Sequence, residues 1–497
     1  MASIGFEHWQ AWQREGCTLL PFALTLPNES LPENLPSSEA APFVLLESAQ
    51  AGRFSYLCDR PHRLIVGDAE GAEIRSGDGV EWRERRRGAP LEILQTLLSA
   101  CRVPATPQLP TMAGGLIGAF GYDLVRTWER LPEMARRDSS VPLYALIEAR
   151  ELFVFDHRDR VLHVVVWRDV VTAHRLADEF ARAEAHARHA LARWTTARAM
   201  NPASSRSLQP PAAAENRASL PPSMTAAEFE SAARRVHDYI AAGHTYQVNL
   251  SRRTSRAVAL PPLRIYEALR RVNPSPYMGL LQLPEFSLVC GSPELLVKLE
   301  NGIVSSRPIA GTRPRGHAAG ASDAHFSAEL LASEKERAEH LMLVDLIRND
   351  IGRVAEYGSV HVPEFMVLEH YSHVMHIVSQ VEGRLAAGRT WRDVFQAMFP
   401  GGTITGCPKI RTMEIIEELE PVGRGFYTGS LGWISYAGEM ELNIVIRSML
   451  VQAGVAHVQA GAGVVADSQP ARELDESERK AQALWVALAA AEAAYRA

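Results

Sequence analysis

The chain has 497 residues, of which 46% are hydrophobic and 22% charged, and its formal net charge at pH 7 is -6. This length is too great for one small core and predicts two or three domains. The acidic balance argues against a nucleic-acid-binding protein, which would usually carry a basic excess. No apolar run reaches the ~20 residues of a membrane span, and the N-terminus lacks a signal-peptide pattern. Five widely spaced cysteines without a C-x-x-C pair are typical of a reduced, cytoplasmic protein.

Residues 1–200 are predicted to form an N-terminal subdomain of strands, loops and one helix. Residues 43–48 are a strand candidate, and residues 151–155 and 161–167 flank a polar turn as a hairpin. Residues 171–199 are rich in Ala, Arg and Glu with helical periodicity, which predicts a helix.

The domain boundary is predicted in the Pro/Ser/Ala-rich stretch 201–222, which is typical of a linker or an exposed loop. Residues 223–497 then form a second, catalytic domain in which strands and helices alternate. Strands are predicted at 245–258, 278–290 and 426–465, a turn at 300–302, and helices from 223 onward, at 329–357 and at 472–495. Because there is no regular βαβ repeat, the pattern favours an α+β fold with a large antiparallel sheet.

Two pairs of glutamates have i, i+3 spacing, Glu336 with Glu339 and Glu473 with Glu476. This spacing places both carboxylates of a pair on one face of a helix. If the fold joins the two pairs, like charges ~4 Å apart repel by about 4 kcal/mol at an effective dielectric of ~20. A hard, oxygen-seeking cation such as Mg2+ would offset this repulsion. Two ordinary solvated helix faces are the alternative that the spacing leaves open.

Several other residues have the chemistry of an anion site. The glycine-rich segments 399–413 and 460–467 each precede a helix, where exposed backbone amides favour an anion; a tight structural turn is the alternative. Arg447 ends an apolar strand and needs a partner, either a ligand carboxylate bound through two hydrogen bonds or an internal salt bridge. His376 lies on an apolar run and by itself indicates a core histidine.

Together these motifs resemble the chorismate-utilising enzymes. The segments 306–315, 340–350 and 399–413 carry the resemblance, which is most specific from about residue 223 to the end. The family includes the large subunits of anthranilate synthase and aminodeoxychorismate synthase, the isochorismate synthases and the salicylate synthases. The resemblance implies a sandwich of two large antiparallel sheets with helices on the outside, chorismate as substrate and Mg2+ as cofactor.

The resemblance also implies roles for individual residues. Glu339 and Glu476 match the main metal ligands, with Glu336 and Glu473 in support. Glu294 matches the general acid that protonates the leaving oxygen, so its pKa is expected to be raised. The implied substrate-binding residues are Thr403, Tyr427, Arg447, Gly461, Gly463 and Lys480, and the other implied catalytic positions are Gln247, Ala310, Thr312 and His376.

Two positions subdivide the family. Gln247 stands where the water-using members carry a lysine base; a neutral amide cannot deprotonate water but can help to position ammonia. This implies amination, with a glutamine amidotransferase subunit as the partner that supplies ammonia.

Ala310 stands where many aminodeoxychorismate synthases carry a lysine that attacks C2, and where anthranilate synthases typically carry alanine. The sequences of residues 399–406, 428–433 and 466–469 are more similar to those of aminodeoxychorismate synthases than to those of anthranilate synthases.

We therefore expect an aminodeoxychorismate synthase component I of the subclass with alanine at this position. In that subclass two ammonia additions, at C2 and then at C4, replace the covalent lysine on the way to p-aminobenzoate and folate. Anthranilate synthase component I, which also eliminates pyruvate and serves tryptophan synthesis, is the alternative. A noncatalytic tryptophan-binding or regulatory subunit is a third interpretation.

A further set of residues resembles the tryptophan pocket of the family, which is regulatory in anthranilate synthases and structural in some aminodeoxychorismate synthases. Bound tryptophan is therefore an expected ligand, and an inter-lobe packing seam is the alternative. The residues of this set are Leu46, Glu47, Ser48, Asn273, Pro276, Tyr277 and Met278.

Overall fold

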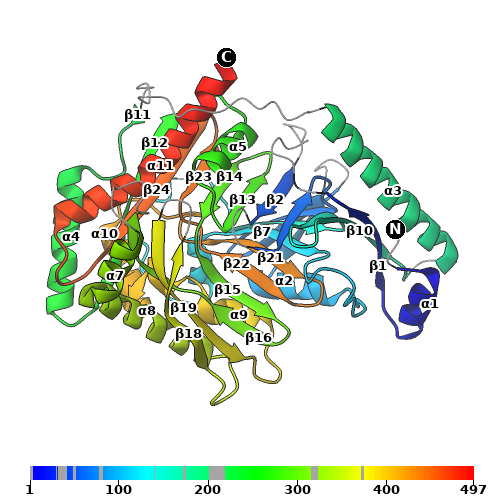
Figure 1. Ribbon diagram of the computed structural model, residues 1–497, viewed down its shortest axis with the longest axis horizontal. Coiled ribbons are helices and arrows are strands. Elements are labelled where there is room, and N and C mark those ends of the chain that lie inside the picture. Colours follow the sequence, from blue (N-terminus) through cyan, green and yellow to red (C-terminus); the bar gives the residue numbers. More distant parts are fainter. Residues whose placement is uncertain are drawn as a thin grey trace.

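The computed structural model describes residues 4–29, 31, 42–48, 52–77, 82–138, 140–171, 175–200, 219–314, 323–370 and 374–496. Two large antiparallel sheets pack against each other, and helices lie around them (Figure 1). This α+β architecture confirms the predicted fold class.

Within the described residues, the first sheet has 12 strands in the order β1-β10-β9-β3-β2-β13-β14-β23-β24-β12-β11, with β20 paired to β12. Their bounds are β1 (Leu19–Pro27), β2 (Phe43–Glu47), β3 (Phe54–Cys58), β9 (Glu151–Asp156), β10 (Val161–Asp169), β11 (Ser219–Leu220), β12 (Gln247–Ala257), β13 (Tyr277–Gln282), β14 (Ser287–Ser292), β20 (Gly406–Cys407), β23 (Ser448–Gln452) and β24 (Val455–Val464).

The second sheet, counted over the same described ranges, also has 12 strands, in the order β17-β19-β16-β15-β22-β21-β7-β8-β4-β5-β6, with β18 paired to β19. Their bounds are β4 (Arg63–Asp68), β5 (Gly71–Ser76), β6 (Arg83–Arg87), β7 (Gly115–Phe120), β8 (Tyr144–Ala149), β15 (Leu295–Glu300), β16 (Ile303–Ser306), β17 (Ile309–Pro314), β18 (His361–His370), β19 (Val374–Arg384), β21 (Ser430–Ser435) and β22 (Met440–Asn443).

The helices connect these strands and cover the sheets (Figure 1). They are α1 (Phe6–Arg14), α2 (Pro90–Ser99), η1 (Tyr122–Thr127), α3 (Leu176–Met200), α4 (Ala226–Ala241), α5 (Pro262–Val272), α7 (Asp323–Ala332), α8 (Glu334–Gly352), α9 (Trp391–Met398), η2 (Gly402–Ile404), α10 (Lys409–Leu419) and α11 (Pro470–Arg496).

Both sheets continue across the predicted domain boundary. In the first sheet β2 pairs with β13, with Leu45 opposite Leu280. In the second sheet β7 pairs with β21, so that in each sheet a block of strands from before the boundary joins a block from after it at one pair of strands. Most of the predicted linker, residues 201–218, lies outside the described residues, and its end forms β11. The division into 1–200 and 223–497 as separate domains stays a prediction.

Local sequence signals account for several elements. The predicted hairpin is confirmed as β9 and β10. The predicted turn between β15 and β16 is confirmed by Asn301 and Gly302, both with positive φ, which these two residue types tolerate best. The single helix predicted at 329–357 is wrong: Ser333 accepts a hydrogen bond from the Glu336 amide and caps a new helix, so α7 and α8 are separate.

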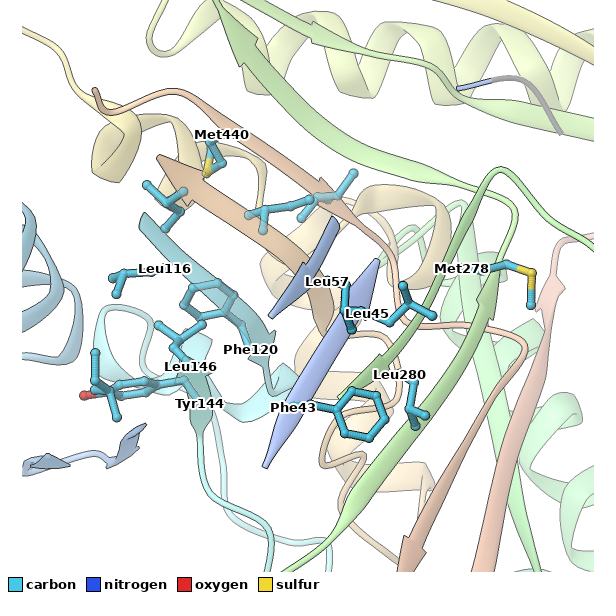
Figure 2. Packing of buried hydrophobic residues seen from close by; sticks show 14 of the residues in the cluster. Phe43, Leu45, Leu57, Leu116, Phe120, Tyr144, Leu146, Met278, Leu280 and Met440 are labelled. Atoms are coloured by element: carbon cyan, nitrogen blue, oxygen red, sulfur yellow. The ribbon is translucent and has the colours of Figure 1, made fainter. Parts of the chain in front are cut away.

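The central strands are buried on both faces, which explains their continuous apolar runs. Val44 and Leu46 pack between the sheets with Ile117 of β7. Because side chains alternate along a strand, Phe43 and Leu45 point to the opposite face, where they belong to the larger cluster that Figure 2 shows. These buried layers hold the strand ends that carry the candidate site.

Candidate functional site

A cavity of about 230 Å3 collects most of the residues to which the sequence assigned chemistry. They come from β12, β17, β19, β24, α8, α11, η2 and the connections that follow β14, α10 and β22. The predicted residues that line it are Gln247, Glu294, Ala310, Glu339, His376, Thr403, Tyr427, Arg447, Gly461, Gly463, Glu476 and Lys480. Segments more than 200 residues apart thus form one site.

Glu294 has the environment of a proton donor. It is 7% exposed, and burial raises its pKa to about 7, although the nearby Thr403 side chain and the charge of Lys480 oppose the shift. Its backbone is fixed, because the Glu294 amide donates to Ser292 Oγ over 3.2 Å and its carbonyl accepts from the Ile444 amide over 3.0 Å. The raised pKa expected from the resemblance is confirmed.

Arg447 brings a partly buried positive charge to the cavity. It adopts φ 51°, a left-handed conformation that costs an ordinary residue free energy. Burial lowers its pKa, while Glu476 and Tyr427 act in the opposite direction. Among the residues that the structure describes, no carboxylate forms an ion pair with Arg447. The internal salt bridge considered from the sequence is therefore not seen there, and a ligand carboxylate fits this environment.

Gln247 and the two glycines of β24 form one tightly packed wall. A Cβ atom on Gly463 would lie 2.3 Å from Gln247 Nε2, and one on Gly461 would lie 2.5 Å from the Leu250 carbonyl oxygen. Only glycine permits this approach. Gln247 is 3% exposed, and its Oε1 atom has no hydrogen-bond partner in the described structure. A buried acceptor of this kind is expected to meet a donor on a bound molecule.

His376 and β17 form the opposite wall. The Nδ1 atom of His376 lies 3.0 Å from the Gly311 carbonyl oxygen, which fixes the ring, and burial lowers its pKa. Gly311 has φ 63° at an irregularity of the ladder between Ala310 and Thr312. Ala310 lines the cavity, whereas the Thr312 side chain lies outside the described part and only its backbone pairing with His376 is placed. His376 is thus partly buried and faces the cavity.

The predicted metal ligands divide between two helices. Glu339 of α8 and Glu476 of α11 both line the cavity. Glu336 lies beside Gly311: a Cβ atom added to Gly311 would be 3.1 Å from Glu336 Oε2. Glu473 does not line the cavity. No group of three or more His, Cys, Asp or Glu side chains in the described ranges is arranged to hold a metal ion.

The donor set nevertheless fits Mg2+, which usually keeps several waters and takes one or two carboxylates together with substrate oxygens. Glu476 pairs with Lys480 over 2.7 Å, and Lys480 also donates to the Gly461 carbonyl over 3.0 Å. Although burial opposes it, Lys480 helps to lower the pKa of Glu476, so this carboxylate is ionised at neutral pH. The magnesium assignment stays a prediction.

The predicted tryptophan segments meet at a second, smaller cavity of about 40 Å3. It is lined by Leu46, Glu47, Ser48, Pro276, Tyr277 and Met278, together with residues of β3, β21 and β22. Asn273 does not line it and instead follows the last residue of α5.

This small cavity has room for little more than a water molecule. It adjoins a polar cavity of about 740 Å3 that shares Ser48 and Tyr277. The Glu47 carboxylate is already bonded, because it accepts from Tyr266 Oη over 2.9 Å and from Arg270 Nε over 2.7 Å. Tryptophan as the ligand stays a prediction.

Sequence reasoning missed several residues of the main cavity. Asn249 lies two positions after Gln247 on β12, and Gln459 lies two positions before Gly461 on β24, so each shares the face of a predicted residue. The period of two along a strand would have found both. Leu343, four positions after Glu339 on α8, follows in the same way from the helical period.

Comparisons with known proteins agree with this site. Residues 41–485 match the chorismate binding enzyme family. The chain belongs to this family, and at that level it is a chorismate-utilising enzyme.

Curated relatives divide between two activities. The chain is 42% identical to aminodeoxychorismate synthase component 1 from Bacillus subtilis over 445 residues, covering 90% of this chain and 91% of the relative. It is 44% identical to anthranilate synthase component 1 from Thermus thermophilus over 460 residues, covering 92% and 94%. These identities leave the particular member of the family open.

Solved structures agree on the fold. Anthranilate synthase component I from Streptococcus pneumoniae superposes with a TM-score of 0.74 at 33% identity, covering 87% of this chain and 92% of that chain. The menaquinone-specific isochorismate synthase from Escherichia coli superposes with a TM-score of 0.69 at 16% identity, covering 97% and 98%, which shows the fold alone. No helix among the described residues is long and apolar enough to cross a membrane.

The first prediction concerns Glu294. Replacing it by glutamine removes the proton donor, so chorismate consumption should fall by about 10²- to 10⁴-fold. In the wild type the carboxyl is protonated below its folded pKa of about 7, so the rate should decline as pH rises through 7. Measured pH–rate profiles of both proteins test this. The control is Glu441→Gln, which alters a partly buried glutamate of raised pKa outside this cavity and should keep the wild-type profile.

Glu294→Gln should also change the free energy of unfolding in a pH-dependent way. Because burial holds the folded pKa of Glu294 above its unfolded value, the group costs stability as pH rises from about 4.5 through 7, by up to ~3 kcal/mol. Glu294→Gln should therefore stabilise the protein more at pH 8 than at pH 5, as measured by urea unfolding. An equal effect at both pH values would contradict the assigned environment.

The second prediction concerns Arg447. Arg447→Met should weaken chorismate binding about 10²-fold, the loss of two hydrogen bonds to a charged group at ~1.5 kcal/mol each. It should not lower the melting temperature, because it removes a buried charge that forms no described ion pair. The control is Arg150→Met, whose guanidinium is paired with Glu148; it should lose stability and keep its affinity. Calorimetric titration and thermal unfolding test both variants, and a destabilised Arg447→Met with normal affinity would refute the binding role.

Proposed function

We propose that this chain is an aminodeoxychorismate synthase component I, which replaces the C4 hydroxyl of chorismate by an amino group. The observation that carries the amination is the Gln247 side chain. It places a neutral amide with an unpartnered Oε1 in the same cavity as Glu294 and Arg447. An amide oxygen can accept a hydrogen bond from ammonia and orient its lone pair, but it is too weak a base to activate water.

The binding step uses the positive end of the cavity. Arg447 and Tyr427 would hold the enolpyruvyl carboxylate, and Thr403 and His376 would line the ring. Mg2+, when bound near Glu339 and Glu476, would neutralise the ring carboxylate and polarise the C4 hydroxyl. The closed packing of Gly461 and Gly463 against β12 excludes bulk water from this wall.

The chemical step uses the proton of Glu294. Ammonia, oriented by Gln247, would attack C2 while Glu294 protonates the departing C4 hydroxyl, which leaves as water. This gives noncovalent 2-amino-2-deoxyisochorismate. A second ammonia would then add at C4 and displace the C2 amine, so that the net change is chorismate plus ammonia to aminodeoxychorismate plus water. Ala310 supplies no amine of its own, which supports the noncovalent route.

The proposal includes a glutamine amidotransferase partner that supplies ammonia, and a role in p-aminobenzoate and folate synthesis. The small cavity and the larger polar cavity that adjoins it at Ser48 and Tyr277 are together proposed to take tryptophan, as a structural or a regulatory ligand. Both parts rest on the family resemblance.

Anthranilate synthase component I is the second candidate. Ala310 favours it, as does the similarity to the Thermus thermophilus relative. It would share the attack of ammonia at C2 and then eliminate pyruvate. A noncatalytic subunit is disfavoured, because Glu294 and Arg447 keep the burial that catalysis and binding require.

The third prediction distinguishes the products. The purified chain is incubated with chorismate, Mg2+ and ammonium, with a parallel sample that contains aminodeoxychorismate lyase. We expect p-aminobenzoate that depends on the lyase, and loss of turnover when EDTA removes the metal. Fluorescent anthranilate without the lyase would instead establish the second candidate, and no chorismate consumption under any condition would support a noncatalytic subunit.

The fourth prediction concerns Gln247. Gln247→Leu keeps the approximate volume against Gly463 but removes the acceptor, so the rate with ammonium should fall at least about tenfold while chorismate affinity changes little. Steady-state kinetics at several ammonium concentrations and a calorimetric titration measure the two quantities. The control is Gln452→Leu, an equivalent change on β23 outside the cavity. Equal loss of chorismate affinity and rate would show that Gln247 acts on the substrate rather than on ammonia.

A further inference from the structure

A buried ion pair stands directly behind the cavity and has no role in the proposed binding and chemical steps. Arg424 Nε donates to Glu420 Oε2 over 2.9 Å, and Arg424 Nη2 donates to Glu420 Oε1 over 2.7 Å. The two side chains are 1% and 2% exposed. Although burial opposes the charge, Glu420 raises the pKa of Arg424 above its usual value. A buried ion pair is weak evidence for stability, because a well-packed apolar pair often does as well.

The remaining donors of Arg424 reach three different walls of the cavity. Nη1 donates to the Ile404 carbonyl over 2.9 Å and to Thr428 Oγ1 over 3.3 Å, and Nη2 donates to the Asn249 carbonyl over 2.7 Å. Ile404 and Asn249 both line the cavity, and Ile404 directly follows Thr403. One rigid guanidinium therefore joins the η2 loop, β12 and the 427–428 segment.

The contact with the 427–428 segment fixes a strained backbone. Thr428 has φ 62°, which is rare for a β-branched residue. Such a conformation persists only where the surroundings determine it. The Tyr427 ring, which lines the cavity, lies over the guanidinium at 5.6 Å, and the Tyr122 ring lies over it at 5.0 Å. Arg424 thus sets the position of Tyr427 through its ring as well as through its neighbour.

Glu420 extends the network to β24. Its Oε1 atom accepts from the Ser251 amide over 2.9 Å and from Ser251 Oγ over 2.8 Å. Ser251 Oγ in turn accepts from Gln459 Nε2 over 2.9 Å, and Gln459 lines the cavity. The pair therefore contacts, directly or through one residue, four of the segments that enclose the substrate.

We propose that Arg424, held by Glu420, is a positioning residue for the chorismate reaction: it fixes Thr403, β12 and Tyr427 relative to one another and so sets how bound chorismate meets Glu294. Arg424 itself does not line the cavity, so it acts through these residues. A displacement of ~1 Å in such a wall can cost about 10²-fold in rate. This inference rests on the proposed use of chorismate, but not on which product is formed.

The fifth prediction is a double-mutant cycle between Arg424→Lys and Thr403→Ala. Lysine keeps the charge beside Glu420 but cannot bond to Ile404, Asn249 and Thr428 at once, because its donors lie on one nitrogen. We expect kcat/KM for chorismate to fall about 100-fold, mainly in kcat. Because Arg424 acts through the Thr403 loop, the double variant should lose little more than Arg424→Lys alone. Multiplicative losses would overturn the proposal.

The matched control is Arg126→Lys. Arg126, like Arg424, binds a glutamate: its Nη2 donates to Glu417 of α10. Its Nε donates to Asp123 and its Nη1 to the Pro132 carbonyl. None of these partners lines the cavity. This variant should lose thermal stability, change kcat/KM by less than about twofold, and combine multiplicatively with Thr403→Ala. A lowered melting temperature with normal kinetics in Arg424→Lys would reduce Arg424 to a structural residue.

Two further measurements keep the test decisive. If Arg424→Lys does not fold, the neutral pair Arg424→Met with Glu420→Leu replaces it, and full activity of that pair would overturn the proposal. If the wild type consumes no chorismate with Mg2+ and ammonium, the proposed function fails. The same cycle is then measured on the dissociation constant of chorismate, where coupling between positions 424 and 403 supports positioning and independence refutes it.

Discussion

Loss of hydration is the constraint on which the whole site depends. Strand ends from both sheets and two long helices close around a small volume, so the charged groups there lose water before any ligand arrives. Glu294 responds by holding its proton near pH 7. Arg447 carries a charge that forms no ion pair with a described carboxylate. Arg424 keeps its charge because it forms an ion pair with Glu420. Loss of hydration thus acts on all three residues, and the partner available to each determines the result. Glu294 keeps its proton, Arg447 is left for an anion, and Arg424 is fixed by Glu420.

The same confinement explains why small residues matter as much as charged ones. The Gln247 amide lies where a side chain on Gly463 would have to be. The Gln247 side chain packs closely against Gly463, and its amide oxygen is left without a hydrogen-bond partner in the described structure. In the proposed function this amide would orient ammonia without activating water, and that role would be the same for the two candidate products. Under the proposed mechanism, the product would be decided by the step after ammonia has attacked C2, in which the ring would either be aminated at C4 or lose pyruvate.

Local patterns in the sequence predicted those features that depend on neighbours along the chain. The β9–β10 hairpin, the Asn301–Gly302 turn and the shared helix face of Glu336 and Glu339 belong to this group. Assembly of the cavity did not follow from spacing, because its walls come from segments hundreds of residues apart; it followed from the resemblance to a family. The sequence did not predict a buried role for Arg424 and Glu420, because an i, i+4 pair of opposite charges usually lies on a helix surface. Only the packing of β12 and η2 around that pair makes it a buried support.

The pairing of an early strand with a late strand in the middle of each sheet also affects how the protein is made. Because β2 completes its ladder with β13, and β7 with β21, neither sheet can close until the second half of the chain has been synthesised. During translation the first half must therefore leave the edges of β2 and β7 unpaired, and such edges readily pair with other chains. Contacts this distant in sequence also slow folding. The topology that assembles the site thus makes the nascent chain dependent on protection from aggregation until its last strands emerge from the ribosome.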